Sequence, residues 1–220
     1  MSPISPIINK LIFGFTFFRE RYFSERKDLY RRLVRDGQKP KIAMVACADS
    51  RVDPAIVLQA DPGDIFAIRN VANLVPPFEE SQEGKTSYHG TSAALEFAVE
   101  QLGVEHIVIF GHAHCSGVKA MVSGREGSPV AGRFVPAWTS IVDKAYTLAK
   151  TKFPTIEGDD LDRCCERQAV LVSLENLMTF PFIRERVDAK TLEIHGWYLD
   201  IAEGELSSYD EAKKEFTPLV

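Results

Sequence analysis

Apolar, β-prone runs alternate with helical patterns along the first half of the chain. Residues 41–47, "KIAMVAC", stand between a proline and the polar "ADSR" and predict a buried strand. Residues 64–70 and 105–110, "DIFAIRN" and "EHIVIF", predict two more strands, and residues 86–102 carry apolar positions at helical spacing. Strand, helix, strand in this order predicts parallel pairing through right-handed crossovers.

Local signals mark where the predicted helices begin and end. Asp53 and Pro54 are suited to be the N-cap and the first residue of a helix that continues into "AIVLQA". Gly103 is suited to be the C-cap of the helix over 86–102.

The second half of the chain predicts helices first and strands afterwards. Helical patterns at about 136–150 and 161–178 precede "TLEIHGWYLDIAEGELSSYD", in which Glu203 and Gly204 are typical of a hairpin turn. We therefore expect an α/β fold: a single domain over residues 38–220, with a central, mainly parallel β-sheet flanked by helices.

Residues 1–37 are expected to form an N-terminal helical arm. The apolar stretch "LIFGFTFF", residues 11–18, runs into the charged "RERYFSERKDLYRRL" and lacks a small-residue cleavage site. This favours an amphipathic helix over a signal peptide or membrane anchor. An apolar helix that cannot bury itself locally suggests docking on a partner subunit.

Composition narrows the class of protein. The 220 residues are 45% hydrophobic, which is enough for a sizeable core, and 26 basic against 31 acidic residues leave a net charge of −5. No dense basic patch interleaved with aromatics stands out, so we expect no nucleic-acid partner and no membrane partner. Four cysteines are too few and too unevenly spaced for a secreted disulfide framework, which favours the cytoplasm.

Three metal-ligand side chains stand at the ends of predicted strands. Cys47 closes the first strand, and His112 and Cys115 follow the third. Ligands of open parallel sheets bind beyond the carboxyl ends of the strands, so these side chains can converge if the strands are neighbours. Zinc held by three protein ligands keeps a position for water, whereas a fourth ligand makes a closed, structural site. A lone histidine is more often a structural residue than a metal ligand. His112 is therefore expected to bind zinc only if Cys47 converges with it and Cys115.

The stretch "ADSR" after the first strand adds an acid and a base. A helix-capping turn would by itself explain Asp49 or Ser50. It does not explain Arg51, which can hold the Asp49 carboxylate by a charge-assisted bond. An ionised aspartate only accepts hydrogen bonds, so it would orient a zinc-bound hydroxide toward an electrophile. Asp49 can alternatively reach the metal itself and close the site.

Cys47-Ala48-Asp49-Ser50-Arg51 together with His112-x-x-Cys115 resembles the β-class carbonic anhydrases. The likeness covers most of the chain and includes "PGDIFAIRNVANLVPPF" at 62–78 and "HGWYLDIAEGEL" at 195–206. It implies one Zn²⁺ per chain held by Cys47, His112 and Cys115. It also implies a catalytic Asp49–Arg51 dyad and reversible hydration of carbon dioxide to bicarbonate and a proton, a lyase activity.

The resemblance also implies a substrate pocket and an assembly. The pocket residues would be Gln38, Phe66, Val71, Tyr88, Ser116 and Gly117. Ser116 departs from the family, which commonly has glycine there, although its backbone N–H remains available. The basic unit would be a homodimer with active sites near the subunit interface, and dimers can pair into a homotetramer.

One branch of the family carries an allosteric bicarbonate pocket built on a tryptophan and a tyrosine. Met44 and Leu199 stand at those places here, so the resemblance implies the branch without the pocket. Arg69 remains and is expected to serve as an ion-pair or capping residue.

Two other functions stay open from the sequence. One is a zinc hydrolase of the same fold that acts on carbon disulfide or carbonyl sulfide, which the zinc ligands do not separate from a carbonic anhydrase. The other is a non-enzymatic zinc or redox-sensing protein, against which the Asp49–Arg51 dyad argues.

Overall fold

The structure is a computed structural model that describes residues 4–80 and 89–219. The chain divides into two compact units, Met1–Gln38 and Lys39–Val220. The first contains α1 (Pro6–Phe17), a π-helical turn η1 (Phe18–Phe23) and α2 (Lys27–Asp36), and none of the described side chains in these helices is buried. In the described part of the chain, no helix has both the length and the apolar character that crossing a bilayer requires.

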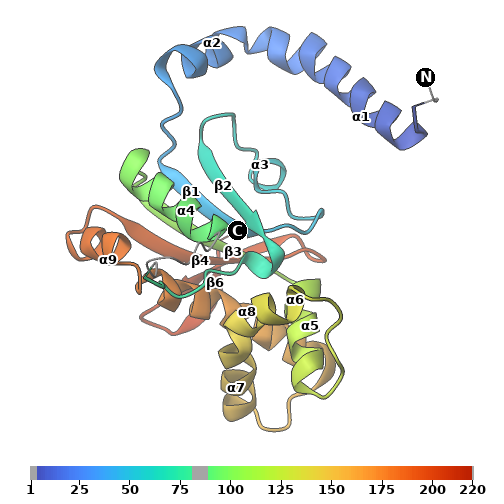
Figure 1. Cartoon of the computed structure of the whole chain (residues 1–220), viewed down its shortest axis with the longest axis vertical. Coiled ribbons are helices and arrows are strands. Elements are labelled where there is room, and N and C mark those ends of the chain that lie inside the picture. The colour runs from blue at the N-terminus through green and yellow to red at the C-terminus, as the bar shows by residue number, and fades with distance from the viewer. Residues whose placement is uncertain (1–3, 81–88, 220) are drawn as a thin grey trace. The chain divides into compact units, whose positions relative to one another are not determined.

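The second unit is a single α/β domain around one sheet (Figure 1). The strand order is β2-β1-β3-β4-β5-β6; the first four strands pair in parallel and the last two antiparallel. This confirms the predicted central, mainly parallel sheet. The turn before β5 confirms the hairpin expected at Glu203 and Gly204. The strands are β1 (Ile42–Cys47), β2 (Ile65–Asn70), β3 (His106–His112), β4 (Glu193–Asp200), β5 (Glu205–Asp210) and β6 (Glu215–Pro218).

Helices connect the strands and flank the sheet. Asp53 caps the first of them by accepting a hydrogen bond from the backbone N–H of Ala55, as predicted. In Figure 1, α5 to α8 gather in the lower part of the view, apart from α4 and α9. The helical segments of this unit are α3 (Pro54–Val57), η2 (Val71–Asn73), α4 (Gly90–Glu96), η3 (Phe97–Gln101), α5 (Ser116–Arg125), α6 (Val135–Thr139), η4 (Ser140–Val142), α7 (Asp143–Lys152), α8 (Gly158–Leu177) and α9 (Pro181–Asp188).

Some elements differ from the pattern-based prediction. The helix expected over 136–150 is broken by the 3₁₀ turn η4, and the first residues of the helix expected over 86–102 lie outside the described residues. The pattern did not predict α5, α9 or β6. Helix α5 contains two glycines and two serines, which lower helix propensity. The apolar stripe of Val118, Met121 and Val122 was therefore too weak a signal to predict a helix.

Alternate residues of β1 and β3 enter two different buried clusters, as expected for a sheet packed on both faces. Ala43 and Val45 lie with Leu95 and Val99 of the α4–η3 helix and with Ile183 of α9. Met44, Ala46, Val108 and Phe110 lie with residues of α5, α7 and α8. The core therefore fixes β1 and β3, whose carboxyl ends carry the predicted zinc ligands.

The long helix α8 packs closely on β3 and β4. A methyl group at Gly111 would lie 2.4 Å from Cγ2 of Val170, and one at Gly196 would lie 2.9 Å from Cγ1 of the same valine. No side chain fits at either glycine without a shift of α8. This close approach sets how far side chains of α8 reach toward the end of β3.

Candidate metal centre

The structure brings Cys47, His112 and Cys115 together. Cys47 is the last residue of β1, His112 is the last residue of the neighbouring β3, and Cys115 is the N-cap of α5. One ligand atom from each lies within 4.8 Å of the other two, and all three residues are buried. The sheet order thus joins residues that are 68 positions apart in the sequence.

The donor set fits a zinc ion. Sγ of Cys47 lies 3.9 Å from Sγ of Cys115, close to the roughly 3.8 Å that separates two sulfurs on a tetrahedral zinc with Zn–S bonds of about 2.3 Å. His112 donates its Nδ1–H to the carbonyl oxygen of Ala113 at 2.8 Å, which leaves Nε2 with its lone pair. Nε2 is buried and has no hydrogen-bond partner among the described residues, as a ligand atom aimed at a metal would be.

The ionisation of the Cys47 thiol and that of the Cys115 thiol depend on each other. The hydrogen bond with Cys115 and the neighbouring His112 together lower the pKa of Cys47 to about 4, against the opposing effect of burial. The same hydrogen bond and burial raise the pKa of Cys115. The pair therefore shares one proton at neutral pH, and a divalent cation that displaces it converts both sulfurs into the thiolate ligands that zinc prefers.

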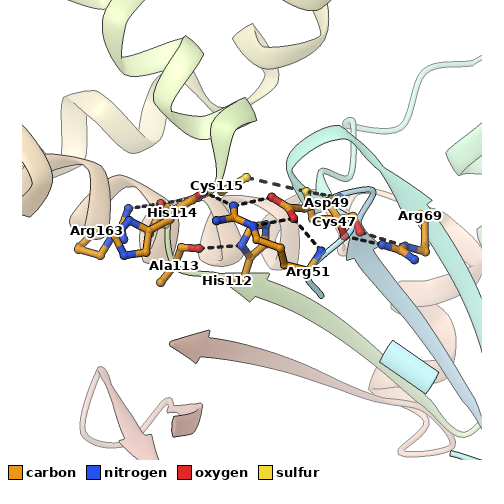
Figure 2. A network of polar contacts seen from close by, with 10 residues as sticks. Cys47, Asp49, Arg51, Arg69, His112, Ala113, His114, Cys115 and Arg163 are labelled. Carbon is orange, nitrogen blue, oxygen red and sulfur yellow. Dashed lines mark hydrogen bonds and ion pairs between the residues drawn. The ribbon is translucent and has the colours of Figure 1, made fainter. Parts of the chain in front are cut away.

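Asp49 and Arg51 form the predicted pair beside the metal ligands (Figure 2). Nε of Arg51 donates to Oδ1 of Asp49 at 3.0 Å and Nη2 donates to Oδ2 at 2.7 Å, and the backbone N–H of Arg51 adds a bond to Oδ1. These bonds to Arg51 hold the pKa of Asp49 well below its usual range. Asp49 is therefore an ionised acceptor whose two oxygens are oriented by one guanidinium.

Two arginines tie the loops of the site together. Arg51 also donates through Nη2 to the carbonyl oxygen of His114 at 2.9 Å, which links the loop after β1 to the loop after β3. Arg69 of β2 donates to the carbonyl oxygens of Cys47 and Asp49 and pairs with the carboxylate of Asp53 at 2.6 Å. Arg69 is thus both an ion-pair and a loop-capping residue.

A buried glutamate on α8 supports the Cys115 turn. Oε1 of Glu166 accepts the backbone N–H of Cys115 at 2.8 Å and a bond from Arg163 at 2.7 Å, while Oε2 accepts the hydroxyl of Tyr198 at 2.8 Å. Burial raises the pKa of Glu166, and these donors act against the rise. The sequence pattern did not predict this role for Glu166. Its signal is an acidic residue next to Cys165 and at helical spacing from the apolar Ala169 and Val170.

Three of the predicted pocket residues lie at the same end of the sheet. Val71 directly follows β2, and Ser116 and Gly117 begin α5. A methyl group at Gly117 would lie 2.8 Å from Cγ1 of Val71 and 2.9 Å from Cβ of Ala72, so the glycine permits this contact. Val71 keeps 42% of its surface exposed, and Ser116 is exposed.

Of the other three predicted pocket residues, only Phe66 is described within the second unit. Phe66 lies four positions before Asn70, the residue paired with Cys47, and its ring packs on Phe97 at 5.8 Å between centroids. Gln38 belongs to the first unit, and Tyr88 lies outside the described residues. Their pocket roles stay predictions.

His114, Cys164 and Cys165 lie outside the candidate metal-ligand group. His114 is exposed, adopts a left-handed φ of 57° and is absent from the metal-ligand group. The neighbouring cysteines of α8 carry free thiols; Cys165 is buried and Cys164 is half-buried.

Comparison with known proteins points to one family. The family model described as "Carbonic anhydrase" matches residues 42–206. A carbonic anhydrase of Synechocystis sp. is 35% identical over 212 residues, which cover 95% of this chain and 73% of that protein. A carbonic anhydrase of Synechococcus elongatus is 32% identical over 213 residues, covering 96% and 74%.

Solved structures agree with this result. The β-carbonic anhydrase CcaA superposes with a TM-score of 0.86 at 34% identity, covering 98% of this chain and 93% of that one. One of two tetrameric β-carbonic anhydrases from Sordaria macrospora gives a TM-score of 0.79 at 25% identity, covering 93% and 97%. By sequence, by fold and by a buried Cys-His-Cys group at the ends of two parallel strands, the chain belongs to the β-class of the carbonic anhydrase family.

Proposed function

We propose that the protein catalyses the zinc-dependent, reversible hydration of carbon dioxide: CO₂ + H₂O ⇌ HCO₃⁻ + H⁺. The main observation behind the proposal is that the Cys47-His112-Cys115 ligand set lies beside the Asp49–Arg51 dyad, whose side chains are joined by two hydrogen bonds. A purely structural zinc site would fill its fourth position with another cysteine or histidine. Family membership supports the same reaction.

Cys47, His112 and Cys115 would hold the zinc ion. When bound, zinc supplies a Lewis acid that makes a water molecule nucleophilic near neutral pH. The Nδ1–H bond to Ala113 keeps the imidazole in one tautomer and one orientation, and the Glu166 bond holds the backbone at Cys115. The ligand positions therefore depend on these two contacts as well as on the strands.

Asp49 would act on the proton of the attacking oxygen. Because Arg51 keeps the carboxylate ionised, Asp49 accepts that proton as a hydrogen bond and turns an oxygen lone pair toward the carbon of CO₂. A nucleophile without a proton cannot donate this hydrogen bond, so the ionised carboxylate disfavours its binding. Orientation of this kind lowers the barrier without the dyad changing its own charge.

The amino end of α5 and Val71 would form the walls of the pocket. The backbone N–H groups at Ser116 and Gly117 stand in the first turn of a ten-residue helix, where they are not used inside the helix and favour negative charge. They suit the oxygen on which bicarbonate charge develops. Val71 offers an apolar surface to a substrate without a net dipole.

Metal content and CO₂ hydration, measured on the wild type and two variants, test the proposal. We expect about one zinc per chain at this centre, loss of that zinc and of activity in Cys47→Ser, and retention of that zinc with about 100-fold slower hydration in Asp49→Ala. Asp49→Ala that binds zinc and hydrates CO₂ at the wild-type rate would remove the proposed role of the dyad. Zinc-loaded wild type that turns over carbonyl sulfide or carbon disulfide and not CO₂ would identify the hydrolase instead.

We also propose a homodimer or a dimer of dimers. Helix α1 leaves large apolar side chains in solvent, with Leu11 67% and Phe13 73% exposed, which is costly for an isolated chain. Sedimentation velocity should therefore give a dimer or a tetramer, and a stable monomer would contradict the proposal.

Because the site needs reduced thiols, we place the protein in the cytoplasm.

We further propose that no bicarbonate pocket regulates this protein. Met44 is 1% exposed and Leu199 is 8% exposed, and Arg69 is already held by Asp53 and two carbonyl oxygens. Bicarbonate should therefore affect turnover only as product. A sigmoidal loss of activity with added bicarbonate would contradict this.

A further inference from the structure

A second group of metal-ligand side chains lies at the opposite end of β3. His106 begins β3, and Glu193 and His195 lie on the adjacent parallel strand β4. In the strand register His106 pairs with Glu193, and His195 follows two residues later, so all three share one face of the sheet. The group stands at the amino ends of the strands, whereas Cys47 and His112 stand at the carboxyl ends.

The ligand atoms already have the separations of a metal site. Nδ1 of His106 lies 3.2 Å from Nε2 of His195, and Oε2 of Glu193 lies 3.7 Å from each of these nitrogens. Ligands on a tetrahedral zinc with bonds of about 2.0–2.2 Å are separated by about 3.3–3.6 Å. A shift of a few tenths of an ångström in the Glu193 side chain would complete the fit.

The electrostatic setting also suits a cation. Among the described residues, the carboxylate of Glu193 pairs with the two histidines and with no lysine or arginine. Two basic groups of this region are engaged elsewhere: Lys41 pairs with Glu105 at 2.5 Å, and Arg186 donates to the carbonyl oxygens of Val99 and Thr191. Burial, aided by His106, lowers the pKa of His195, which keeps that imidazole neutral and able to bind a metal.

We propose that His106, Glu193 and His195 bind a borderline divalent transition ion such as Zn²⁺, at a site separate from the proposed catalytic centre. Two imidazoles and a carboxylate are a zinc-type ligand set, and three protein ligands leave one position for water. The bound ion replaces the proton that one histidine otherwise donates to the other. It cross-links two strands whose ligands are 89 residues apart in sequence and so stabilises the folded state.

Equilibrium dialysis of the full chain against buffered Zn²⁺, followed by metal analysis, tests the site. We expect two zinc ions per chain in the wild type and one in His195→Gln, with the second zinc kept in Cys47→Ser. Loss of a direct ligand should weaken zinc binding at least about tenfold, because loss of a residue that only hydrogen-bonds to a ligand already lowers metal affinity by about tenfold. His89→Gln replaces a histidine outside the group and should still bind two ions.

Spectra and melting curves add readouts that do not depend on catalysis. Co²⁺ at the Cys-His-Cys centre should give intense sulfur-to-metal absorption, and Co²⁺ at the second site should add only weak visible bands that disappear in His195→Gln. Added Zn²⁺ should raise the melting temperature of Cys47→Ser, and this rise should disappear when His195→Gln is combined with it. A single zinc per wild-type chain, or a second zinc that persists in His195→Gln, would overturn the proposal. Neither result would bear on CO₂ hydration.

Discussion

Strand β3 ends in a histidine at each terminus, and the two ends differ in how their metal-ligand groups are held. At the carboxyl end, His112 is 1% exposed, and backbone groups of its neighbours are bound by Glu166, Arg51 and Arg69. At the amino end, the side chains of His106 and Glu193 are 38% and 68% exposed. The first group is fixed by hydrogen bonds from surrounding residues, whereas the second is held by strand register and by contacts among its own members. Similar ligand types can therefore form a preorganised centre or an adaptable one, depending on what surrounds them.

Removing Glu166 should cause the largest loss of stability. Glu166→Ala leaves the buried N–H of Cys115 and the hydroxyl of Tyr198 without their acceptor and Arg163 without its counter-charge, so the free energy of unfolding should fall by about 3–5 kcal/mol. Zinc should also dissociate faster into a chelator. Denaturant titration and chelator kinetics measure the two effects.

Glu175→Ala is the matched control on the same helix. Glu175 pairs with Lys144, and both side chains are more than half exposed, so this change should cost less than about 1 kcal/mol. Glu166→Gln, which keeps the shape and one acceptor oxygen, should fall between the two. Equal losses in Glu166→Ala and Glu175→Ala would contradict the view that a buried network fixes the carboxyl-end centre.

Filling the space at Gly117 should have a smaller effect on the same centre. In Gly117→Ala the new methyl group collides with Val71 and Ala72, which should cost about 1–3 kcal/mol and displace the pocket wall. CO₂ hydration should slow several-fold while zinc stays bound. Gly90→Ala has no atom within 4 Å of the new methyl and should change stability by no more than about 0.5 kcal/mol. A Gly117→Ala protein with unchanged rate and stability would show that this contact is dispensable.

The amino-end group should give the smallest effect, a dependence of stability on pH. Burial and His106 lower the pKa of His195 in the folded state, and Glu193 opposes the shift. The unfolded chain therefore binds more protons at this residue. The stability that neutral His195 contributes is fully present above the ordinary histidine pKa of about 6.5 and is lost as the pH falls through the lower pKa of the folded state. Metal-free unfolding at pH 7 and pH 5 should show a smaller drop in His195→Gln than in the wild type. An identical drop would mean that His195 is not held neutral.

The sequence predicted the first three strands and the candidate metal ligands because their signals are local. Apolar runs and their polar ends marked β1, β2 and β3, and Cys47, Asp49, Arg51, His112 and Cys115 lie in short motifs. The prediction missed a helix where local propensity is weak, as in glycine- and serine-containing α5. Short motifs survive such errors because their spacing does not depend on the exact ends of helices.

Only the tertiary structure decided what surrounds these motifs. Glu166 reaches Cys115 because α8 packs against two glycines of β3 and β4, and His106 meets His195 because of the register between those strands. Neither contact has a local signature, since its residues are 51 and 89 positions apart. The sequence by itself determined which ligands the chain carries, and packing between distant segments decided how firmly each group is held.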